Sequence, residues 1–438
     1  MKKVASQFCK LIVIGGSFCS AIVTVPALAI GSSDERRLDA ALNLNSGFED
    51  LNSKSVYPTD KEGIHSANNL LGVELKLRQS SNTVFQFTGY AMRVTELKSL
   101  GPNDAIITEE KYISKVGQAF VSHRFMDNYK LTIGRQRVLW GHGLSYVPSD
   151  FINPPLEPES LDLVNARGVD AIVLDYFLAK NNFTFIVNKN NNMERAGVGG
   201  KWTSNLIDSL DFNLVYYNSA ETGNALGLSF SADPQALIGE SQGQFNVTAN
   251  IALRERSQYP VIVYEVLPEY LTTKVGPLQD EKNSPFLTYL IGGSYEFIES
   301  RLSLRSEFYY IEDAYSQEDL QGIYHSLLTA SYANDSPYGW LNVLAFGRNQ
   351  QRYFNLTLNR ETHTEGSENH FTNTLSYGIG LTRGLEDHSE LISLNINSSY
   401  FDAVELSLDI LVPQGKSDTE FGTMPFNWRA SFGMKYIF

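Results

Sequence analysis

The sequence predicts an all-β protein: a transmembrane antiparallel up-and-down β-barrel of about 18 strands, with 16 or 20 strands as the alternatives. Three observations lead to this prediction. The final residues, 427–438, alternate apolar and polar side chains, the first 29 residues read as a secretory signal, and short alternating stretches repeat between them. We therefore expect a signal peptide over 1–29, a periplasmic lead-in over 30–66 and the barrel over 67–438.

The amino-terminal stretch has the three parts of a signal peptide. An apolar core spans 11–25, and Ala27-Leu28-Ala29 is a small-x-small cleavage site. The positive charges before the core are Lys2, Lys3 and Lys10. The two cysteines, Cys9 and Cys19, lie in the segment that we expect to be removed. Disulfides, thiolate metal sites and cysteine nucleophiles are then excluded from the mature chain, which functions beyond the inner membrane.

The composition excludes several classes of protein. The net charge is −14, and loss of the three signal-peptide lysines makes it more negative, so nucleic acid is not expected as a partner. After residue 29 there is no apolar run long enough for a transmembrane helix. The aromatic content of 12% and the mean hydropathy of −0.20 suit a barrel in which every second strand residue meets lipid. A large soluble all-β protein has similar values, so the two chain ends decide between them.

The last strand has one apolar and one polar face. The apolar face consists of Trp428, Ala430, Phe432, Met434, Tyr436 and Phe438, and the polar face of Asn427, Arg429, Ser431, Gly433 and Lys435. An aromatic-capped terminal strand resembles the closing strand and assembly signal of bacterial outer-membrane barrels. That resemblance implies outer-membrane lipid as the surroundings and the barrel-assembly machinery as a partner that reads the strand ending in Phe438.

The chain between these ends is taken in order. Residues 30–66 are polar, and 34–42 are expected to form a short helix, with at most a weak strand nearby. Alternation begins at Leu71, a turn is expected over 80–83, and the run from 84 to 93 completes a hairpin. The clearest later strands are 245–254, 287–297, 302–310 and 404–410. Weaker strands are expected near 112–124, 128–138, 168–178, 182–190, 195–203, 210–218, 224–231, 259–267, 322–332, 338–348, 351–360, 371–382 and 390–400.

Loop lengths test this strand count. Working back from Phe438, the long connections 413–426, 312–321 and 268–285 fall on the side away from the termini, as expected for external loops. The long connections 139–167 and 94–111 fall on the opposite side, so one strand is miscounted between 190 and 270. Eighteen strands is the count that we adopt, and an unplugged barrel of that size encloses a lumen too wide for side chains to fill.

Charged residues on the predicted inner faces are nearly balanced. The basic ones are Lys76, Arg78, Lys130, Arg254, Arg305, Arg429 and Lys435, and the acidic ones are Glu74, Glu296, Glu307, Glu405 and Asp409. This balance does not favour a strongly anion-selective tube.

The stretch from Gly134 to Pro158 is the predicted constriction. Tyr129, Leu131 and Ile133 set a lipid-facing phase that would place the next arginines in hydrocarbon, at a cost of about 2–4 kcal/mol each. A bulge at Gly134 is expected to turn this run into the lumen, with Arg135, Gln136 and Arg137 as its lining. The proline-containing segment that follows is predicted to fold inward as a constriction loop with Trp140, His142, Asp150 and Asn153, and an ordinary external loop is the alternative.

This stretch also resembles a known family. Gly134-Arg-Gln, Trp140-Gly-x-Gly, Asp150-x-x-Asn-Pro and Ala166-Arg-Gly resemble the alginate-export-type porins, over about 73–176. The resemblance implies an outer-membrane channel whose lumenal arginines, matched by Arg135 and Arg137, pass an anionic polysaccharide. The charge balance departs from that pattern.

Catalytic and metal sites are weakly indicated. None of the seven histidines lies in a hydrolase or zinc-protease motif, and His142 with Ser145 and Asp150 is the only local cluster. Two acidic groups have the residue types of cation sites without a dedicated order: His363, Glu365, Glu368 and His370, and Asp150, Glu157, Glu159 and Asp162. We therefore expect no enzyme, cofactor or metal.

The sequence favours a passive channel in the outer membrane of a Gram-negative bacterium, for small hydrophilic solutes or saccharides. The alternatives are an adhesion, receptor or structural barrel that uses its acidic external loops, and an outer-membrane hydrolase. The lipid-facing residues show no flat polar interface, which favours a monomer over a trimer.

Overall fold

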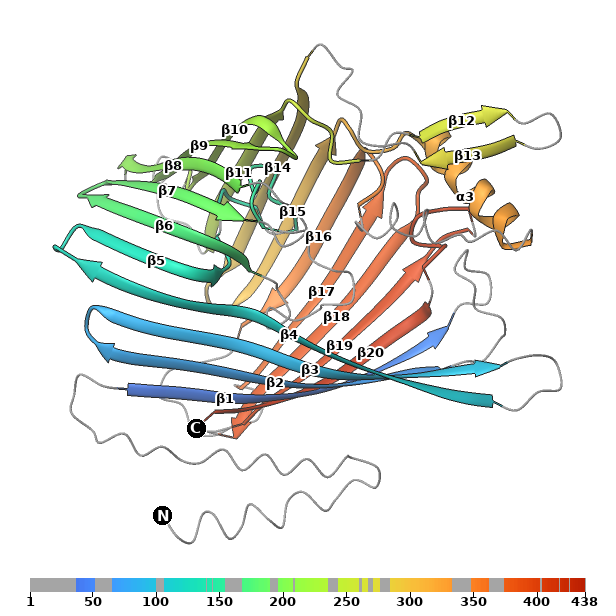
Figure 1. Ribbon diagram of the computed structural model, residues 1–438, viewed down its shortest axis with the longest axis horizontal. Helices are drawn as coiled ribbons and strands as arrows, with labels where there is room; N and C mark the ends of the chain where they lie inside the picture. Colours follow the sequence, from blue (N-terminus) through green and yellow to red (C-terminus); the bar gives the residue numbers. More distant parts are fainter. Residues whose placement is uncertain are drawn as a thin grey trace, which may run out of the picture.

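Among the residues that it describes, the computed structural model forms a closed barrel of 18 antiparallel strands with one helix, so the predicted fold class and strand number are confirmed (Figure 1). The structure describes residues 37–51, 65–99, 106–153 without 139 and 144, 168–189, 196–234 without 208, 243–259, 262–266, 271–275, 284–332, 348–361, and 374–437 without 402, 403, 417 and 425. The predicted signal peptide lies outside these residues.

The barrel strands follow one another around the wall in chain order. They are β1 (Arg37–Leu51), β2 (His65–Ser80), β3 (Thr83–Ser99), β4 (Ile106–Phe125), β5 (Tyr129–Gln136), β6 (Val169–Leu178), β7 (Asn181–Lys189), β8 (Ala196–Ile207), β9 (Leu210–Ser219), β10 (Gly223–Ala232), β11 (Gly243–Arg254), β14 (Phe286–Phe297), β15 (Leu302–Ile311), β16 (Arg352–Arg360), β17 (Leu375–Gly384), β18 (Glu390–Phe401), β19 (Val404–Gln414) and β20 (Phe426–Ile437). The other elements are the hairpin of β12 (Ile262–Val266) and β13 (Leu271–Val275), and the helix α3 (Gln317–Tyr332).

Strand β1 closes the barrel by pairing with both β2 and β20. Ala41, for example, lies between Glu74 of β2 and Ile437 of β20. The helix expected over 34–42 is therefore wrong from residue 37 onward, and the barrel begins before residue 67. The pairing partners on both sides satisfy the backbone groups of β1, which outweighs the local preference for a helix.

The connections differ in length between the two ends of the barrel. The end that holds the termini has mostly short turns, such as 81–82, 126–128 and 179–180, and the loop end has the long connections, including 137–168. Two strands expected from the sequence are not in the barrel. Part of 259–267 forms β12, in the separate hairpin, and 322–332 is helical, while 338–347 lies outside the described residues and Arg348 follows them without forming a strand. Figure 1 shows β12, β13 and α3 together, away from the end of the barrel where β1 begins and β20 ends.

A cap explains why 322–332 is helical despite its aromatic and β-branched residues. The Ser316 hydroxyl accepts the backbone N–H of Asp319 at 3.2 Å, and the Asp319 carboxylate accepts the backbone N–H of Ser316 at 3.2 Å. This reciprocal capping box begins α3, and Ile323 and Tyr324 of the helix are fully buried. The capping residues Ser316 and Asp319 precede 322–332, so the alternation within 322–332 alone does not reveal the helix.

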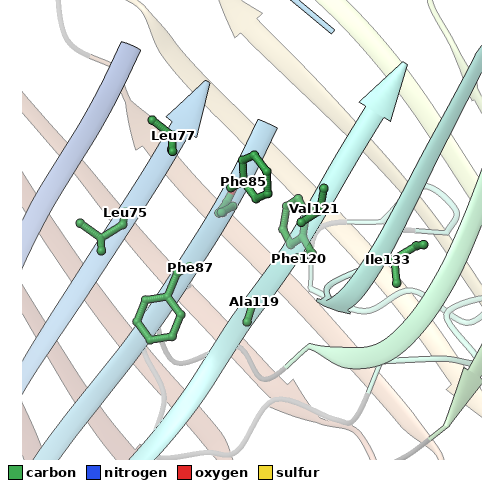
Figure 2. Close-up of a pocket in the computed structure, with 9 residues that line it drawn as sticks. Leu75, Leu77, Phe85, Phe87, Ala119, Phe120, Val121 and Ile133 are labelled. Carbon is green, nitrogen blue, oxygen red and sulfur yellow. The ribbon is translucent and has the colours of Figure 1, made fainter. Parts of the chain in front are cut away.

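The outer face of the barrel is apolar. Figure 2 shows this face across β2 to β5, where Leu75, Leu77, Phe85, Phe87, Val121 and Ile133 surround a depression of about 270 Å³. Near the short turns, an outward row of stacked rings runs from Phe125 through Tyr129, Tyr176 and Phe183 to Trp202, with centroid distances from 4.6 to 6.5 Å. Such an aromatic girdle borders the apolar band of outer-membrane barrels. No helix in the described part of the chain is long and apolar enough to cross a membrane.

We predict that an arginine on the outer face destabilises the barrel and that the same residue on the inner face does not. Phe185→Arg replaces an outward side chain in the middle of β7, and the expected cost is about 2–4 kcal/mol because the charge enters hydrocarbon. Asn397→Arg, on the inner face of β18, is the matched control and is expected to change stability by less than about 1 kcal/mol. Denaturant unfolding of protein refolded in lipid vesicles measures both, and equal losses would contradict the assignment of the two faces.

Candidate functional site

Residues 137–153, here called the inward segment, fold into the barrel and lie against the inner wall of β6 to β11. Trp140 is 1% exposed, and its ring meets the ring of Tyr217 of β9 edge-on at 6.1 Å. Phe151 stacks on the same tyrosine at 6.4 Å. The buried cluster that these side chains form comprises Val138, Trp140, Phe151 and Ile152 of the segment with Val169, Ala171, Val173, Ile186, Val215, Tyr217, Ala225 and Ala252 of the wall. The segment is therefore held by burial of apolar surface inside the lumen.

Polar contacts fix the middle of the inward segment. The Asn250 side chain of β11 accepts the backbone N–H of Ser149 at 3.1 Å and donates to its hydroxyl at 3.0 Å. His142 accepts from the Asn213 amide at 3.1 Å, and burial lowers the pKa of His142, so the imidazole is neutral near pH 7. Gly227 of β10 makes room for this packing, because a Cβ there would lie 2.5 Å from the Cβ of Ser149.

A turn closes the base of the inward segment. The Asp150 carboxylate accepts the backbone N–H of Asn153 at 3.2 Å and its side-chain amide at 3.0 and 2.9 Å. Asn153 also accepts the backbone N–H of Val138 at 3.1 Å and donates to its carbonyl. Burial raises the pKa of Asp150 to about 6, although these hydrogen bonds and the charge of Arg137 lower it. Asp150 and Asn153 thus hold the two ends of the segment together.

The tip of the inward segment is clamped between an anion and a cation. The Glu307 carboxylate of β15 accepts the backbone N–H of Ser145 at 2.8 Å and also its hydroxyl. Arg348 donates to the Ser145 carbonyl, and its guanidinium lies 5.1 Å from the ring centroid of Tyr146 and 5.8 Å from that of Tyr309. We call Glu307 and Arg348 the tip clamp. Hydrogen bonds to ionised groups are stronger than those between neutral groups, so the tip has one fixed position against β15.

The structure contradicts the predicted lumenal position of Arg135. The β4–β5 register is continuous from Ala119–Arg135 to Phe125–Tyr129, so Gly134 makes no bulge, and Arg135 stays on the outer face with Ile133. Its guanidinium donates two hydrogen bonds of 2.9 Å to Asp170 of β6. Because Asp170 neutralises Arg135, and Arg135 lies one residue from the end of β5, the arginine does not bear the cost of a lone charge in lipid. The alternation of outward and inward residues can therefore continue through Arg135.

Gly134 has a different role from the one expected. Its φ is 125°, and a Cβ there would lie 2.3 Å from the Ala119 carbonyl oxygen. Glycine therefore permits close contact between β4 and β5 while the register is unchanged.

The other predicted lining residues lie on inner strand faces or in the inward segment. Gln136 is buried and donates to the Ala171 carbonyl at 3.3 Å, and Arg137 follows β5 beside Asp150. The inward positions by alternation are Lys76, Arg78, Arg254, Arg305, Glu307, Arg429 and Lys435. Arg254 is fully buried in an ion pair of 2.9 Å with Asp313, and Lys435 lies 3.5 Å from Glu74 across the closing strand β1. Several of these charges are therefore locally compensated.

The structure does not assemble the cluster of His142, Ser145 and Asp150. Each binds a different partner: His142 contacts Asn213, Ser145 contacts Glu307, and Asp150 contacts Asn153. The hydrogen bonds of these three residues therefore do not join them as a nucleophile, a base and an orienting acid. Within the described residues no group of three or more histidines and carboxylates is arranged to hold a metal ion, and residues 157–162 and 363–370 lie outside them.

A signal for the inner apolar wall was present in the sequence. Val169, Ala171 and Val173 face inward on β6, and Ile172 and Leu174 have the opposite parity, so both faces of this strand are apolar. A strand that is apolar on both faces is covered on both sides. In a barrel, the inner cover has to come from a segment inside the lumen.

A buried network of polar side chains, here called the knot, consists of Gln350, Tyr353, Asp387 and Glu420 and joins three connections at the loop end. Gln350 donates to Asp387 at 2.8 Å and to Glu420 at 2.9 Å, and Tyr353 donates to Glu420 at 2.6 Å. Tyr353 stacks on Tyr309 at 4.9 Å, so the knot lies next to the ring that the tip clamp uses. Burial raises the pKa of Glu420 to about 7.

Comparison with known proteins gives a fold and no closer relationship. No known protein family and no functionally characterised protein matches the sequence. Among solved structures the chain is similar to OccAB3 of Acinetobacter baumannii, with a TM-score of 0.52 and 10% identity over 93% of this chain and 100% of that one. It is also similar to OccAB1 of the same organism (TM-score 0.52, 8% identity, 92% and 96% covered) and to OccK7 of Pseudomonas aeruginosa (TM-score 0.52, 9% identity, 92% and 99% covered). These are outer-membrane porins, and the likeness shows their barrel fold.

We predict that the knot at the loop end becomes more stable as the pH falls. The pKa of Glu420 is raised from 4.5 to about 7, so its contribution to stability is complete below about 4.5 and is lost as the pH rises through 7. The size is on the order of 3 kcal/mol, at about 1.4 kcal/mol per pKa unit. Hydrogen exchange of 349–353 and 418–424 between pH 5 and 8, corrected for intrinsic rates, measures it.

Glu420→Gln is expected to remove this pH dependence, and Glu318→Gln, at an exposed position of α3, is the matched control that keeps it. A wild-type protection that does not change between pH 5 and 8 would refute the prediction.

Proposed function

We propose that the protein is a channel in the outer membrane of a Gram-negative bacterium, through which small hydrophilic solutes diffuse passively, and that the inward segment sets its selectivity. The observation that carries this proposal is the inward segment itself, which is packed against one side of the lumen and clamped at its tip. A barrel of 18 strands encloses a lumen. A segment fixed inside the lumen against β6 to β11 narrows the passage that is left for a solute.

The location is part of the same proposal. The apolar outer face and its aromatic girdle suit a bilayer, and the signal peptide read from residues 1–29 directs the chain across the inner membrane. The strand that ends in Phe438 would be read by the barrel-assembly machinery, and the continuous apolar outer face favours a monomer.

Passive conduction requires no covalent chemistry, and we propose that the protein is not an enzyme. The one local set of catalytic residue types is separated, because Ser145 is engaged by Glu307 and His142 by Asn213. The resemblance over about 73–176 to alginate-export-type porins supports a saccharide as the solute, whereas the compensated lumenal charges argue against an anionic polymer.

We predict a steady ion conductance from the mature protein in planar bilayers, and a larger one when the tip clamp is removed. Glu307→Ala deletes the acceptor for Ser145, so the tip can leave β15 and the mean conductance is expected to rise by about half, with more frequent transitions between levels. Glu405→Ala, a carboxylate on the inner face of β19, is the matched control and keeps the wild-type level. Absence of conductance from a correctly folded wild-type barrel would overturn the channel.

We predict that ion selectivity depends on Arg305 and not on Arg135. Arg305→Ser removes an inward cation, so the reversal potential under a salt gradient is expected to shift toward cation preference. Arg135→Ser is expected to leave the reversal potential unchanged and to lower stability by about 1 kcal/mol, because the half-exposed Asp170 loses its partner. The opposite pattern would place Arg135 in the conduction path.

A further inference from the structure

A small cavity lies between the tip of the inward segment and the inner wall of β15 and β16. Its volume is about 280 Å³. The residues that line it are Ser145, Arg305, Glu307, Asn355, Thr357 and Asn359. They supply one guanidinium, one carboxylate, two amides and two hydroxyls, so the lining has many hydrogen-bonding groups and no formal net charge. All six lie on the inward segment or on inner strand faces.

The charges of the lining favour neither cations nor anions. Glu307 is 2% exposed and already accepts two hydrogen bonds from Ser145. Arg305 lies two residues away on the same face of β15, so the two opposite charges are adjacent. A free ion entering the cavity therefore meets opposing fields from these two groups, and the net electrostatic attraction is small.

The neutral lining groups are oriented by their neighbours. The Asn355 amide donates to the Thr382 hydroxyl at 2.8 Å, and its oxygen accepts from the Thr357 hydroxyl at 3.1 Å. These bonds use one N–H and one lone pair of Asn355, and an amide has a second N–H and a second lone pair. Asn355 thus keeps capacity both to donate and to accept.

This mixed capacity matches the hydroxyl groups of a sugar. A hydroxyl is both donor and acceptor, and the neighbouring hydroxyls of a pyranose ring present two such groups side by side. Planar amide and guanidinium groups present paired hydrogen-bonding atoms that suit such neighbours. An apolar solute, in contrast, would leave these polar groups without partners, which is costly in a confined site.

The wall beside the cavity continues with the same chemistry. On the inner face of β17 stand Gly378 and Gly380, and on β18 stand Ser393, Asn395 and Asn397. Asn397 donates to Asn395 at 2.6 Å, and a Cβ at position 380 would lie 2.4 Å from the Ser393 hydroxyl. The face is therefore neutral, polar and low in side-chain bulk.

We propose that this cavity is the solute site of the channel and that it binds one neutral monosaccharide or polyol through its hydroxyls. Its 280 Å³ corresponds to about nine water molecules at roughly 30 Å³ each, which fits a single sugar ring and excludes an oligosaccharide lying wholly inside it. The proposal rests on the channel function, whose solute class it specifies.

The test uses D-glucose as the neutral probe, with D-glucuronate and D-glucosamine as charged sugars of similar size. Block of single-channel current by D-glucose is expected to saturate in the millimolar range, and each charged sugar is expected to require a higher concentration. Asn355→Leu and, separately, Thr357→Val are expected to raise the half-saturating glucose concentration by about tenfold, through loss of one or two hydrogen bonds. Asn397→Leu, on the inner face outside the cavity, is the matched control and leaves it unchanged.

A direct binding measurement separates this proposal from the channel function. Equilibrium dialysis of labelled D-glucose against the detergent-solubilised barrel requires no conduction. A barrel that conducts but neither binds glucose nor is blocked by it overturns the sugar site and leaves the channel standing. A barrel that binds glucose with dependence on Asn355 but does not conduct supports the site and overturns the channel. Tighter binding of either charged sugar overturns the neutral solute class.

Discussion

The structure depends on one constraint, which is that every backbone N–H and C=O in the hydrocarbon layer has to be paired within the protein. A sheet meets this requirement only when its first and last strands pair, so β1 is drawn between β2 and β20 although its residues would otherwise favour a helix. Pairing also fixes which side chains face lipid, and because the β4–β5 register has no bulge, no residue of β5 can be turned from the outer face to the inner face. Arg135 shows the consequence: the chain keeps the register and neutralises the arginine with Asp170.

Closure of the barrel also creates a lumen, whose inner surface would be exposed to water unless another part of the chain covers it. On β6 to β11 that inner surface is apolar, and exposure to lumenal water would be unfavourable. The inward segment covers it with Trp140, Phe151 and Ile152. The opposite wall, on β16 to β18, is lined with amides, hydroxyls and glycine and remains compatible with water. In the proposed channel, folding and permeation would therefore be linked, since the apolar patch that holds the segment also determines which side of the lumen the segment covers.

The sequence contained most of the fold and only part of the site. Alternation is a local property, so the strands, the 18-strand count and the inner position of Arg305 or Lys435 could be predicted. The segment's inward folding was predicted from its prolines and aromatic residues, and the doubly apolar β6 would have strengthened the argument. Two of the wrong predictions came from judging a stretch by its alternation alone. The strand expected over 322–332 is a helix because Ser316 and Asp319 form a capping box, and Arg135 stays on the outer face because it pairs with Asp170. The tip clamp could not be predicted, because Ser145 and its partners Glu307 and Arg348 are far apart in the chain and meet only through closure.

In the proposed channel, the tip clamp would connect the rigidity of the inward segment with selectivity. Ser145 is bound from one side by the carboxylate of Glu307 and from the other by the guanidinium of Arg348, and the same Glu307 lines the cavity beside Arg305. The charges of Glu307 and Arg305 oppose each other in the cavity, so in the proposed sugar site the amides and hydroxyls would be the groups that distinguish one solute from another. Arg348 lies against Tyr309, which stacks on Tyr353 beside Glu420. The position of the inward segment is therefore supported by loop-end residues outside the cavity, and in the proposed channel the recognition of a solute would depend on their packing as well as on the residues that line the cavity.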